Sequence, residues 1–167
     1  VWASIEKSGK RQQVCALMKL GRLLGDPGLF VRPIMAKKFQ GTCLESLNLI
    51  MCGGAYLAEK VAEELQAFGI LVLLGYGITE CSPLIAVDVY YHSKPGSVGP
   101  AVTSCMVRIE DAVTDEDGHG IGEICVKGKN VMLGYYKDEA ATADAFTADG
   151  WFRTGDLGYL DDEGYIY

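Results

Sequence analysis

Histidine is scarce in this sequence and the cysteines are unpaired, which argues against several kinds of site. The two histidines, His92 and His119, lack metal-ligand spacing with any cysteine. The six cysteines are widely spaced, form no CxxC pair and mostly stand inside apolar runs. This usage is typical of small buried thiols in a reducing compartment. We therefore expect a cytoplasmic protein and place both histidines in surface loops.

Long apolar runs are also missing. No stretch approaches the roughly 20 uninterrupted apolar residues of a membrane span, and the first residues lack the charged-then-apolar pattern of a signal peptide. The first 50 residues carry eight Lys or Arg and three acids, whereas the rest carries seven and nineteen. The basic stretch leaves peripheral membrane contact open, although we favour a solvated helix face. Nucleic acid is not indicated, because no basic and aromatic residues interleave.

Hydrophobic residues make up 49% of the 167 residues. A chain of this length and composition can bury one sizeable core or two small ones, so we expect a folded globular piece. The sequence opens on Val1 without a Met and closes on a run, 164–167, that reads as the middle of a strand. We therefore expect a piece of a longer protein.

The N-terminal third predicts helix. Apolar residues recur there at spacings of three and four: Val14, Leu17, Leu20 and Leu24. This spacing predicts an amphipathic helix that ends near Gly25. A second, less regular helical stretch is expected over residues 33–39.

A strand, a helix and a strand follow. The apolar run 47–52 is closed by two glycines and predicts a buried strand. Val61, Leu65 and Phe68 mark one face of a helix that Gly69 stops. The run 70–74 predicts a second strand. A crossover this short joins parallel strands in a right-handed sense.

Two glycine-rich turns follow these strands, at 53–55 and 75–77. Ligands of open parallel sheets bind beyond the carboxyl ends of the strands, where both turns are expected. The missing side chains would let a flat ring or a phosphate approach the backbone, while Thr79 offers a hydroxyl and Glu80 a carboxylate. Spacing alone leaves the alternative, two ordinary tight turns, open.

The pattern changes near residue 91, where Gly and Pro become frequent and short β-like runs appear at 106–110, 122–127 and 165–167. We expect a short helix between Asp138 and Phe146. The acidic stretch 111–120 is interpreted as a solvated hairpin loop, since the regular ligands of a calcium loop are absent.

These patterns divide the chain into two parts. Residues 1–91 are expected to form an α/β segment with a parallel βαβ unit. Residues 92–167 are expected to form a β-rich subdomain, with the strands closed into a distorted β-barrel.

Three motifs resemble those of one enzyme family. Residues 75–80, GYGITE, are similar to the YGxTE motif of the adenylate-forming (AMP-binding) superfamily. The run 122–128 with 134–136 resembles the family's next signature, and 150–158 resembles its TGDL motif with flanks. The three occur in the family's order and spacing, and the resemblance covers most of the chain from Leu47 onward. It implies part of the large N-terminal domain of an acyl-CoA synthetase-like enzyme.

The resemblance implies roles for individual residues, with nucleotide-binding positions at Gly54, Ala55, Gly75, Tyr76, Gly77, Thr79 and Asp156. Gly54 and Ala55 would line the adenine pocket and Tyr76 would stack on the base. Thr79 would bond a phosphate oxygen and Glu80 would help hold Mg²⁺, which makes these two the catalytic candidates. Asp156 would accept hydrogen bonds from both ribose hydroxyls. Taken singly, each residue also fits a bland role as a buried aromatic, a turn cap or a surface charge.

Two further runs indicate which subfamily the sequence resembles. The runs 82–88 and 94–99 resemble long-chain fatty acyl-CoA ligases more than aryl ligases or amino-acid adenylation domains. Leu74 departs from relatives that carry a polar residue before GYG, which leaves one adenine contact open. We assign Cys81 to packing rather than nucleophilic chemistry, and Trp151 to core packing.

The resemblance implies a reaction that uses ATP, Mg²⁺, a fatty acid and coenzyme A. A carboxylate attacks the α-phosphate to give acyl-AMP, and the thiol of coenzyme A then displaces AMP. The family's upstream phosphate loop has no match here, and its C-terminal domain with a catalytic Lys would follow Tyr167. We expect these parts of the same chain to be required partners and the 167 residues to be inactive alone. A non-catalytic nucleotide-binding module and an amino-acid or aryl-acid adenylation domain remain alternatives.

Overall fold

The structure is a computed structural model, and it describes residues 6–7, 9, 11–24, 33–34, 37, 45–55, 57–89 and 92–167. The chain forms two compact units. The first comprises residues 1–51 and 57–72, and the second comprises residues 52–56 and 73–167. The units do not follow chain order, because residues 52–56 belong to the second unit while residues 57–72 belong to the first. The division expected at residues 91 and 92 stays a prediction.

Two helices characterise the first unit. Helix α2 (Arg11–Leu24) confirms the amphipathic prediction and buries Val14. Helix α4 (Glu59–Ala67) contacts α2 and is followed by Gly69, which adopts a left-handed φ of 76° and donates its N–H to the carbonyl of Gln66. Glycine suits this position because it adopts positive φ without steric cost. Most of the helical stretch expected over 33–39 lies outside the described residues.

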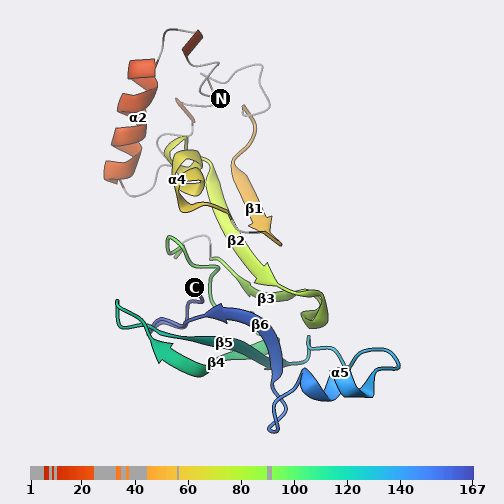
Figure 1. The fold of residues 1–167 in the computed structure, drawn as a ribbon. Coiled ribbons are helices and arrows are strands. Elements are labelled where there is room, and N and C mark those ends of the chain that lie inside the picture. Colours follow the sequence, from red (N-terminus) through yellow and green to blue (C-terminus); the bar gives the residue numbers. More distant parts are fainter. Residues whose placement is uncertain are drawn as a thin grey trace. The chain divides into compact units, whose positions relative to one another are not determined.

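Strands β1 (Leu49–Gly53), β2 (Leu71–Gly77) and β3 (Leu84–Val87) form one sheet in that order. Figure 1 shows β1 and β2 running in the same direction, which confirms the predicted parallel pair. Strand β3 pairs antiparallel to β2, with Tyr76 opposite Ala86. The expectation of a buried first strand is wrong. Met51 is 66% exposed, because the described residues leave its face of the edge strand β1 uncovered.

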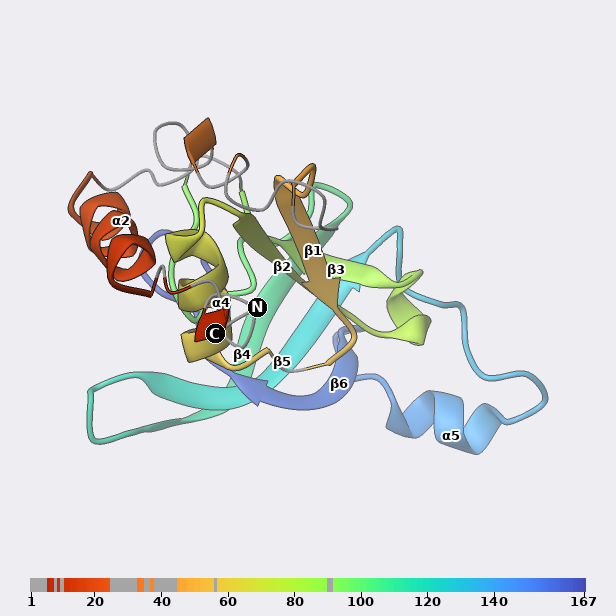
Figure 2. The same ribbon diagram turned by 90° about the horizontal axis from the view of Figure 1, so that it is seen from above.

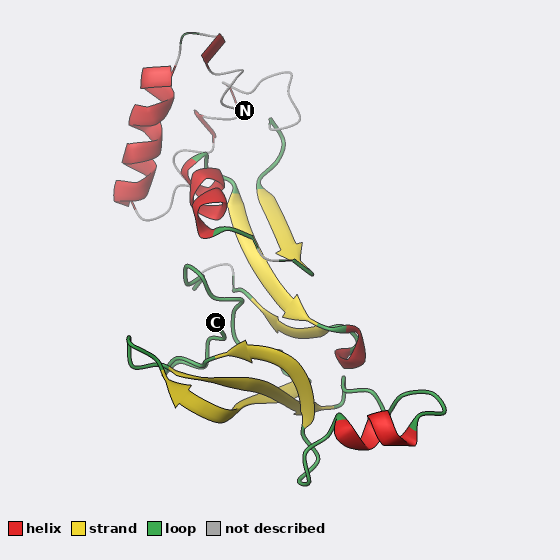
Figure 3. Ribbon diagram, in the orientation of Figure 1, coloured by secondary structure: helices red, strands yellow, loops and turns green. Residues whose placement is uncertain are grey.

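The second unit contains an antiparallel sheet of β4 (Cys105–Thr114), β5 (Gly120–Gly128) and β6 (Phe152–Gly158), in that order. Figure 3 shows the three strands as one curved layer. The expected barrel is not confirmed, since in the described part of the chain this sheet is open, with β4 and β6 at its edges. The run 165–167 forms isolated bridges rather than a strand.

Short helical elements connect these strands. The 3₁₀ helix η1 (Thr79–Cys81) follows β2. Helix α5 (Glu139–Asp144) confirms the predicted short helix, and the Asp138 side chain caps it by accepting the N–H of Ala141 at 2.9 Å. Figure 2 shows α5 and the β4–β5 turn at opposite ends of the second unit.

The core of the second unit packs β3 against the sheet of β4, β5 and β6. Its buried members are Cys81, Ile85, Ala86, Ile124, Val126, Phe152 and Ile166. They come from η1, β3, β5, β6 and the C-terminal segment. Packing between these elements brings together the three family-like motifs, which are far apart in sequence.

The described helices contain no segment that is long and apolar enough to cross a membrane. The five cysteines within the described residues are free thiols, and Cys81 and Cys125 are fully buried. Their burial confirms the packing role assigned to Cys81.

Candidate functional site

A hydrogen bond between Tyr76 and Asp156 connects two of the three motifs. The Tyr76 hydroxyl donates to Asp156 Oδ2 at 2.7 Å, across 80 positions of sequence. Tyr76 lies near the end of β2 and Asp156 lies in β6. The second unit therefore brings together the two side chains that the sequence assigned to a base and a ribose.

Tyr76 is a neutral donor in this contact. Burial raises its pKa well above the ordinary value, and the hydrogen bond and negative charge of Asp156 raise it further, while a hydrogen bond with Thr154 acts against them. The ring also packs against the core of the second unit. The phenol thus stays protonated at neutral pH and holds the carboxylate.

Asp156 is positioned by a local irregularity of β6. The Thr154 hydroxyl donates to the carbonyl of Ile124 at 2.7 Å and accepts the N–H of Asp156 at 3.1 Å. Gly155 has a φ of 76° and donates its N–H to Glu123 Oε1 at 3.0 Å. The register of β5 and β6 shifts here, as at a β-bulge. Asp156 remains exposed, so its carboxylate is accessible to a ligand.

The glycines of the GYG turn have different roles. A Cβ on Gly77 would lie 1.9 Å from the carbonyl oxygen of Pro83, so the close approach of two backbone segments requires glycine there. A Cβ on Gly75 would meet no atom closer than 3.7 Å. Gly77 therefore has a structural role, whereas Gly75 has room beside it.

The first glycine-rich turn lies beside the second. A Cβ on Gly53 would lie 3.0 Å from the carbonyl oxygen of Gly75, which places the ends of β1 and β2 side by side. Gly54 has a φ of 77°, and both it and Ala55 are exposed. The expectation that both turns meet at one edge of the sheet agrees with this geometry. Their nucleotide contacts stay a prediction.

Thr79 and Glu80 stand together in η1, with Thr79 exposed and Glu80 half-buried. Glu80 Oε1 accepts a hydrogen bond from the Tyr135 hydroxyl at 3.1 Å. A carboxylate next to a hydroxyl offers the hard oxygen donors that Mg²⁺ prefers. The sequence placed Tyr135 in a motif but gave no signal of its contact with Glu80.

Two assignments made for other residues have different outcomes. Cys81 is fully buried, and burial raises the pKa of its thiol to about 11, which does not suit a nucleophile. Trp151 was expected in the core, but it is only half-buried. The guanidinium carbon of Arg108 lies 4.7 Å from the centroid of its ring. A cation over the ring face explains this position better than core packing does.

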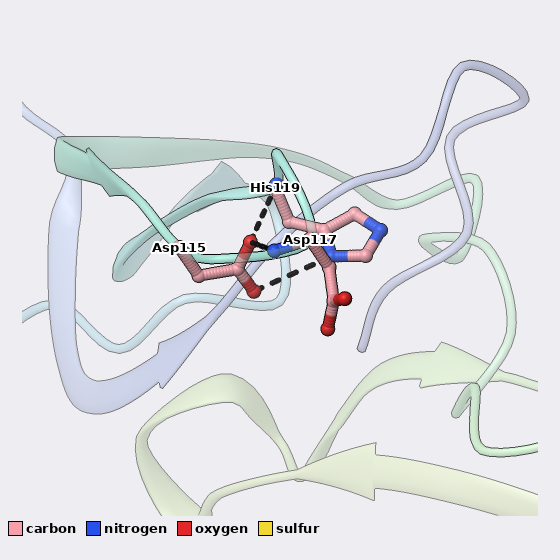
Figure 4. Close-up of side chains that lie close together, drawn as sticks. All are labelled: Asp115, Asp117 and His119. Carbon is pink, nitrogen blue, oxygen red and sulfur yellow. Dashed lines mark hydrogen bonds and ion pairs between the residues drawn. The ribbon is translucent and has the colours of Figure 1, made fainter.

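Asp115, Asp117 and His119 gather at the turn between β4 and β5, with potential ligand atoms within 4.8 Å of one another (Figure 4). Asp115 Oδ1 accepts the backbone N–H of both other residues, at 3.0 and 2.7 Å. The His119 backbone contact is the main cause that lowers the pKa of Asp115. This is the geometry of an Asx turn, so we assign the cluster to closing the hairpin between β4 and β5. The loop is shorter than the predicted 111–120, because residues 111–114 belong to β4 and Gly120 begins β5.

Relatives of known type match most of the chain. A chain 41% identical over 143 residues is a long-chain-fatty-acid–CoA ligase of Salmonella typhimurium, with 83% of this chain and 25% of that protein covered. A 2-succinylbenzoate–CoA ligase of Bacillus velezensis is 43% identical over 132 residues, covering 75% of this chain and 26% of that protein. The chain therefore spans about a quarter of the length of these relatives.

The fold also matches a solved structure. The crystal structure of ATP-bound MatB from Rhodopseudomonas palustris superposes with a TM-score of 0.63 and 37% identity, over 71% of this chain and 24% of that chain. The family model described as AMP-binding enzyme matches residues 17–136, more than half of the chain. The chain thus belongs to the AMP-binding, or adenylate-forming, enzyme family.

Proposed function

We propose that these residues form the nucleotide-binding part of a longer AMP-forming acyl-CoA ligase. The contact between Tyr76 and Asp156 carries this proposal, because it joins the two motifs that would bind the base and the ribose. The exposed apolar side chains of β1, Leu49 and Met51, support a longer protein. Apolar strands of parallel sheets are ordinarily covered on both faces.

ATP would bind along the edge formed by the two glycine-rich turns. Gly54, Ala55 and Gly75 would pass close to adenine, and Tyr76 would stack on it. Asp156 would accept from the ribose hydroxyls through lone pairs that Tyr76 does not use, since a carboxylate has about four acceptor positions. Thr79 would donate to a phosphate oxygen.

Glu80 would hold the Mg²⁺ ion that accompanies ATP. Among the described residues no salt bridge joins this carboxylate to a Lys or Arg, and Tyr135 occupies only one of its oxygens. A second oxygen is therefore available to a hard cation that takes its remaining ligands from phosphates and water. The bound ion would neutralise charge that develops on the phosphates.

The reaction would have two steps. The substrate carboxylate attacks the α-phosphorus of ATP and pyrophosphate leaves, which gives an acyl adenylate. The thiol of coenzyme A then attacks the acyl carbon and AMP leaves. The cationic groups expected upstream and beyond residue 167 would be needed for the first step, so we propose that the 167 residues alone are inactive.

The substrate we propose is a long-chain fatty acid, on the similarity of residues 82–88 and 94–99 to ligases of that type. The matched relatives include ligases for both long-chain fatty acids and 2-succinylbenzoate, so their names supply the reaction class rather than the acid. A cytoplasmic location, with contact to a membrane surface through the basic N-terminal stretch, would suit such a substrate.

Pyrophosphate exchange into ATP tests the proposed substrate. The full-length protein that carries this chain should be assayed with acetate, benzoate, palmitate, 2-succinylbenzoate and a mixture of amino acids. We expect palmitate to drive the fastest exchange. Exchange driven by an aryl acid or an amino acid would correct the substrate, whereas ATP binding without exchange for any acid would indicate a non-catalytic nucleotide-binding module.

A further inference from the structure

Glu80 is attached at two points to the segment that follows β5. The Tyr135 hydroxyl donates to Glu80 Oε1 at 3.1 Å, and the N–H of Met132 donates to the backbone carbonyl of Glu80 at 2.7 Å. One contact fixes the main chain of η1 and the other fixes the side chain. The orientation of Glu80 therefore depends on residues more than 50 positions away.

Tyr135 is itself held in place by its surroundings. Its N–H donates to the Thr142 hydroxyl at 2.9 Å, and that hydroxyl donates to the carbonyl of Asp138 at 2.7 Å. A Cβ on Gly134 would lie 2.7 Å from the Thr142 side chain, so glycine permits this close approach. The loop from 132 to 142 thus fixes the backbone of Tyr135, from which its hydroxyl reaches Glu80.

The direction of the hydrogen bond between Tyr135 and Glu80 is also defined. The Tyr135 hydroxyl carries the proton, and the carboxylate oxygen of Glu80 accepts it. Its single proton is directed at Oε1. The adjacent Tyr136 is different, because it is 88% exposed and lies beside Lys137.

We propose that Tyr135 is a positioning residue for Glu80, whose hydroxyl fixes one carboxylate oxygen so that the other faces the divalent cation bound with ATP. This inference rests on the proposed function of the site. It assigns Tyr135 no contact with the substrate. The hydroxyl acts by restricting the rotation of a carboxylate that would otherwise sample several orientations in solvent.

The test compares Tyr135→Phe with Tyr136→Phe in the full-length protein. Each variant loses one hydroxyl from neighbouring positions, but only the first loses the contact with Glu80. We expect the Mn²⁺ concentration that half-saturates the protein in the presence of ATP, measured by electron paramagnetic resonance, to rise roughly three- to tenfold for Tyr135→Phe. The Mg²⁺ requirement of pyrophosphate exchange should rise in parallel, while Tyr136→Phe resembles the wild type.

A Glu80→Gln background separates positioning from general damage. If the Tyr135 hydroxyl acts through the Glu80 carboxylate, then adding Tyr135→Phe to Glu80→Gln should cause no further loss of Mn²⁺ affinity. Equal losses in both backgrounds, or equal behaviour of the two Phe variants, would overturn the inference. Normal Mn²⁺ and ATP binding without exchange for any acid would refute the proposed reaction, while the Mn²⁺ comparison still decides the role of Tyr135.

Discussion

The Tyr76 hydroxyl and the Asp156 carboxylate are the two groups on which the candidate site most depends. Their hydrogen bond uses one acceptor position of the carboxylate and leaves the others for a ligand. A fixed carboxylate loses less conformational freedom when a ribose binds, so preorganisation would favour affinity. The raised pKa of Tyr76 keeps the donor protonated.

Tyr76→Phe should change how stability depends on pH. The unfolded chain loses the Tyr76 proton near the ordinary pKa of 10.0, whereas the folded protein retains it to higher pH. The stability from the neutral phenol is therefore fully present below pH 10 and is lost as the pH rises further. We expect the difference in free energy of unfolding between wild type and Tyr76→Phe to shrink above about pH 10 in urea titrations. A constant difference between about pH 8 and 11 would contradict this assignment.

Cys81 should resist alkylation in the folded protein. Its side chain is fully buried and burial raises the pKa of its thiol to about 11, so little reactive thiolate exists at neutral pH. Mass spectrometry after iodoacetamide treatment should find Cys81 modified in denaturant but not under native conditions. Rapid native modification would instead indicate an activated thiol.

Residue identities were more predictable than residue contacts. The motifs assigned Tyr76, Glu80 and Asp156 to one ligand, and the structure joins the first and the last of these by a hydrogen bond. The contact between Tyr135 and Glu80 could not be predicted, because it depends on how the loop after β5 returns to η1. Trp151 was misplaced because an apolar ring predicts burial more readily than contact with Arg108.

At the scale of elements, the end of β2 lies in close backbone contact with the chain that leads into β3. The chain turns through η1 and returns as β3, so the backbone at Gly77 and Pro83 lies in close contact. A side chain at Gly77 would push the two strands apart. Gly75, on the other side of Tyr76 in the sequence, has space beside it for a side chain.

Gly77→Ala and Gly75→Ala should therefore separate stability from binding. We expect Gly77→Ala to lower the free energy of unfolding by more than about 2 kcal/mol, since its Cβ would meet backbone atoms. Gly75→Ala should cost under about 1 kcal/mol but weaken ATP binding, because its methyl group would enter the proposed adenine pocket. Thermal unfolding of both variants measures the change in stability, and nucleotide titration measures the change in ATP affinity. Equal stability of the two would show that the close approach at Gly77 can relax.

Periodic elements were predictable from the sequence and irregular ones were not. The spacing of apolar residues predicted α2 and α4, and glycine-bounded runs predicted β1 and β2. Strand β3 escaped prediction because it is only four residues long. Strand β6 contains Gly155 at positive φ and a shifted register, so its sequence lacks the alternation that indicates a strand.

At the scale of the whole molecule, the chain corresponds to one part of its longer relatives. It spans about a quarter of its relatives, and its first sheet leaves an apolar strand at the edge. The residues proposed for base, ribose, phosphate and Mg²⁺ all belong to the second unit. The cationic groups that the proposed first step would require are expected elsewhere in the protein.

Acid-dependent exchange of pyrophosphate into ATP, measured for wild type, Asp156→Asn and Asp162→Asn in the full-length protein, tests whether Asp156 binds the nucleotide. Asp162 is an exposed aspartate a few residues beyond β6, so its variant controls for the loss of one charge. We expect exchange in the wild type and in Asp162→Asn, and a loss of roughly tenfold or more in Asp156→Asn. Equal exchange in all three proteins would contradict the account of this site.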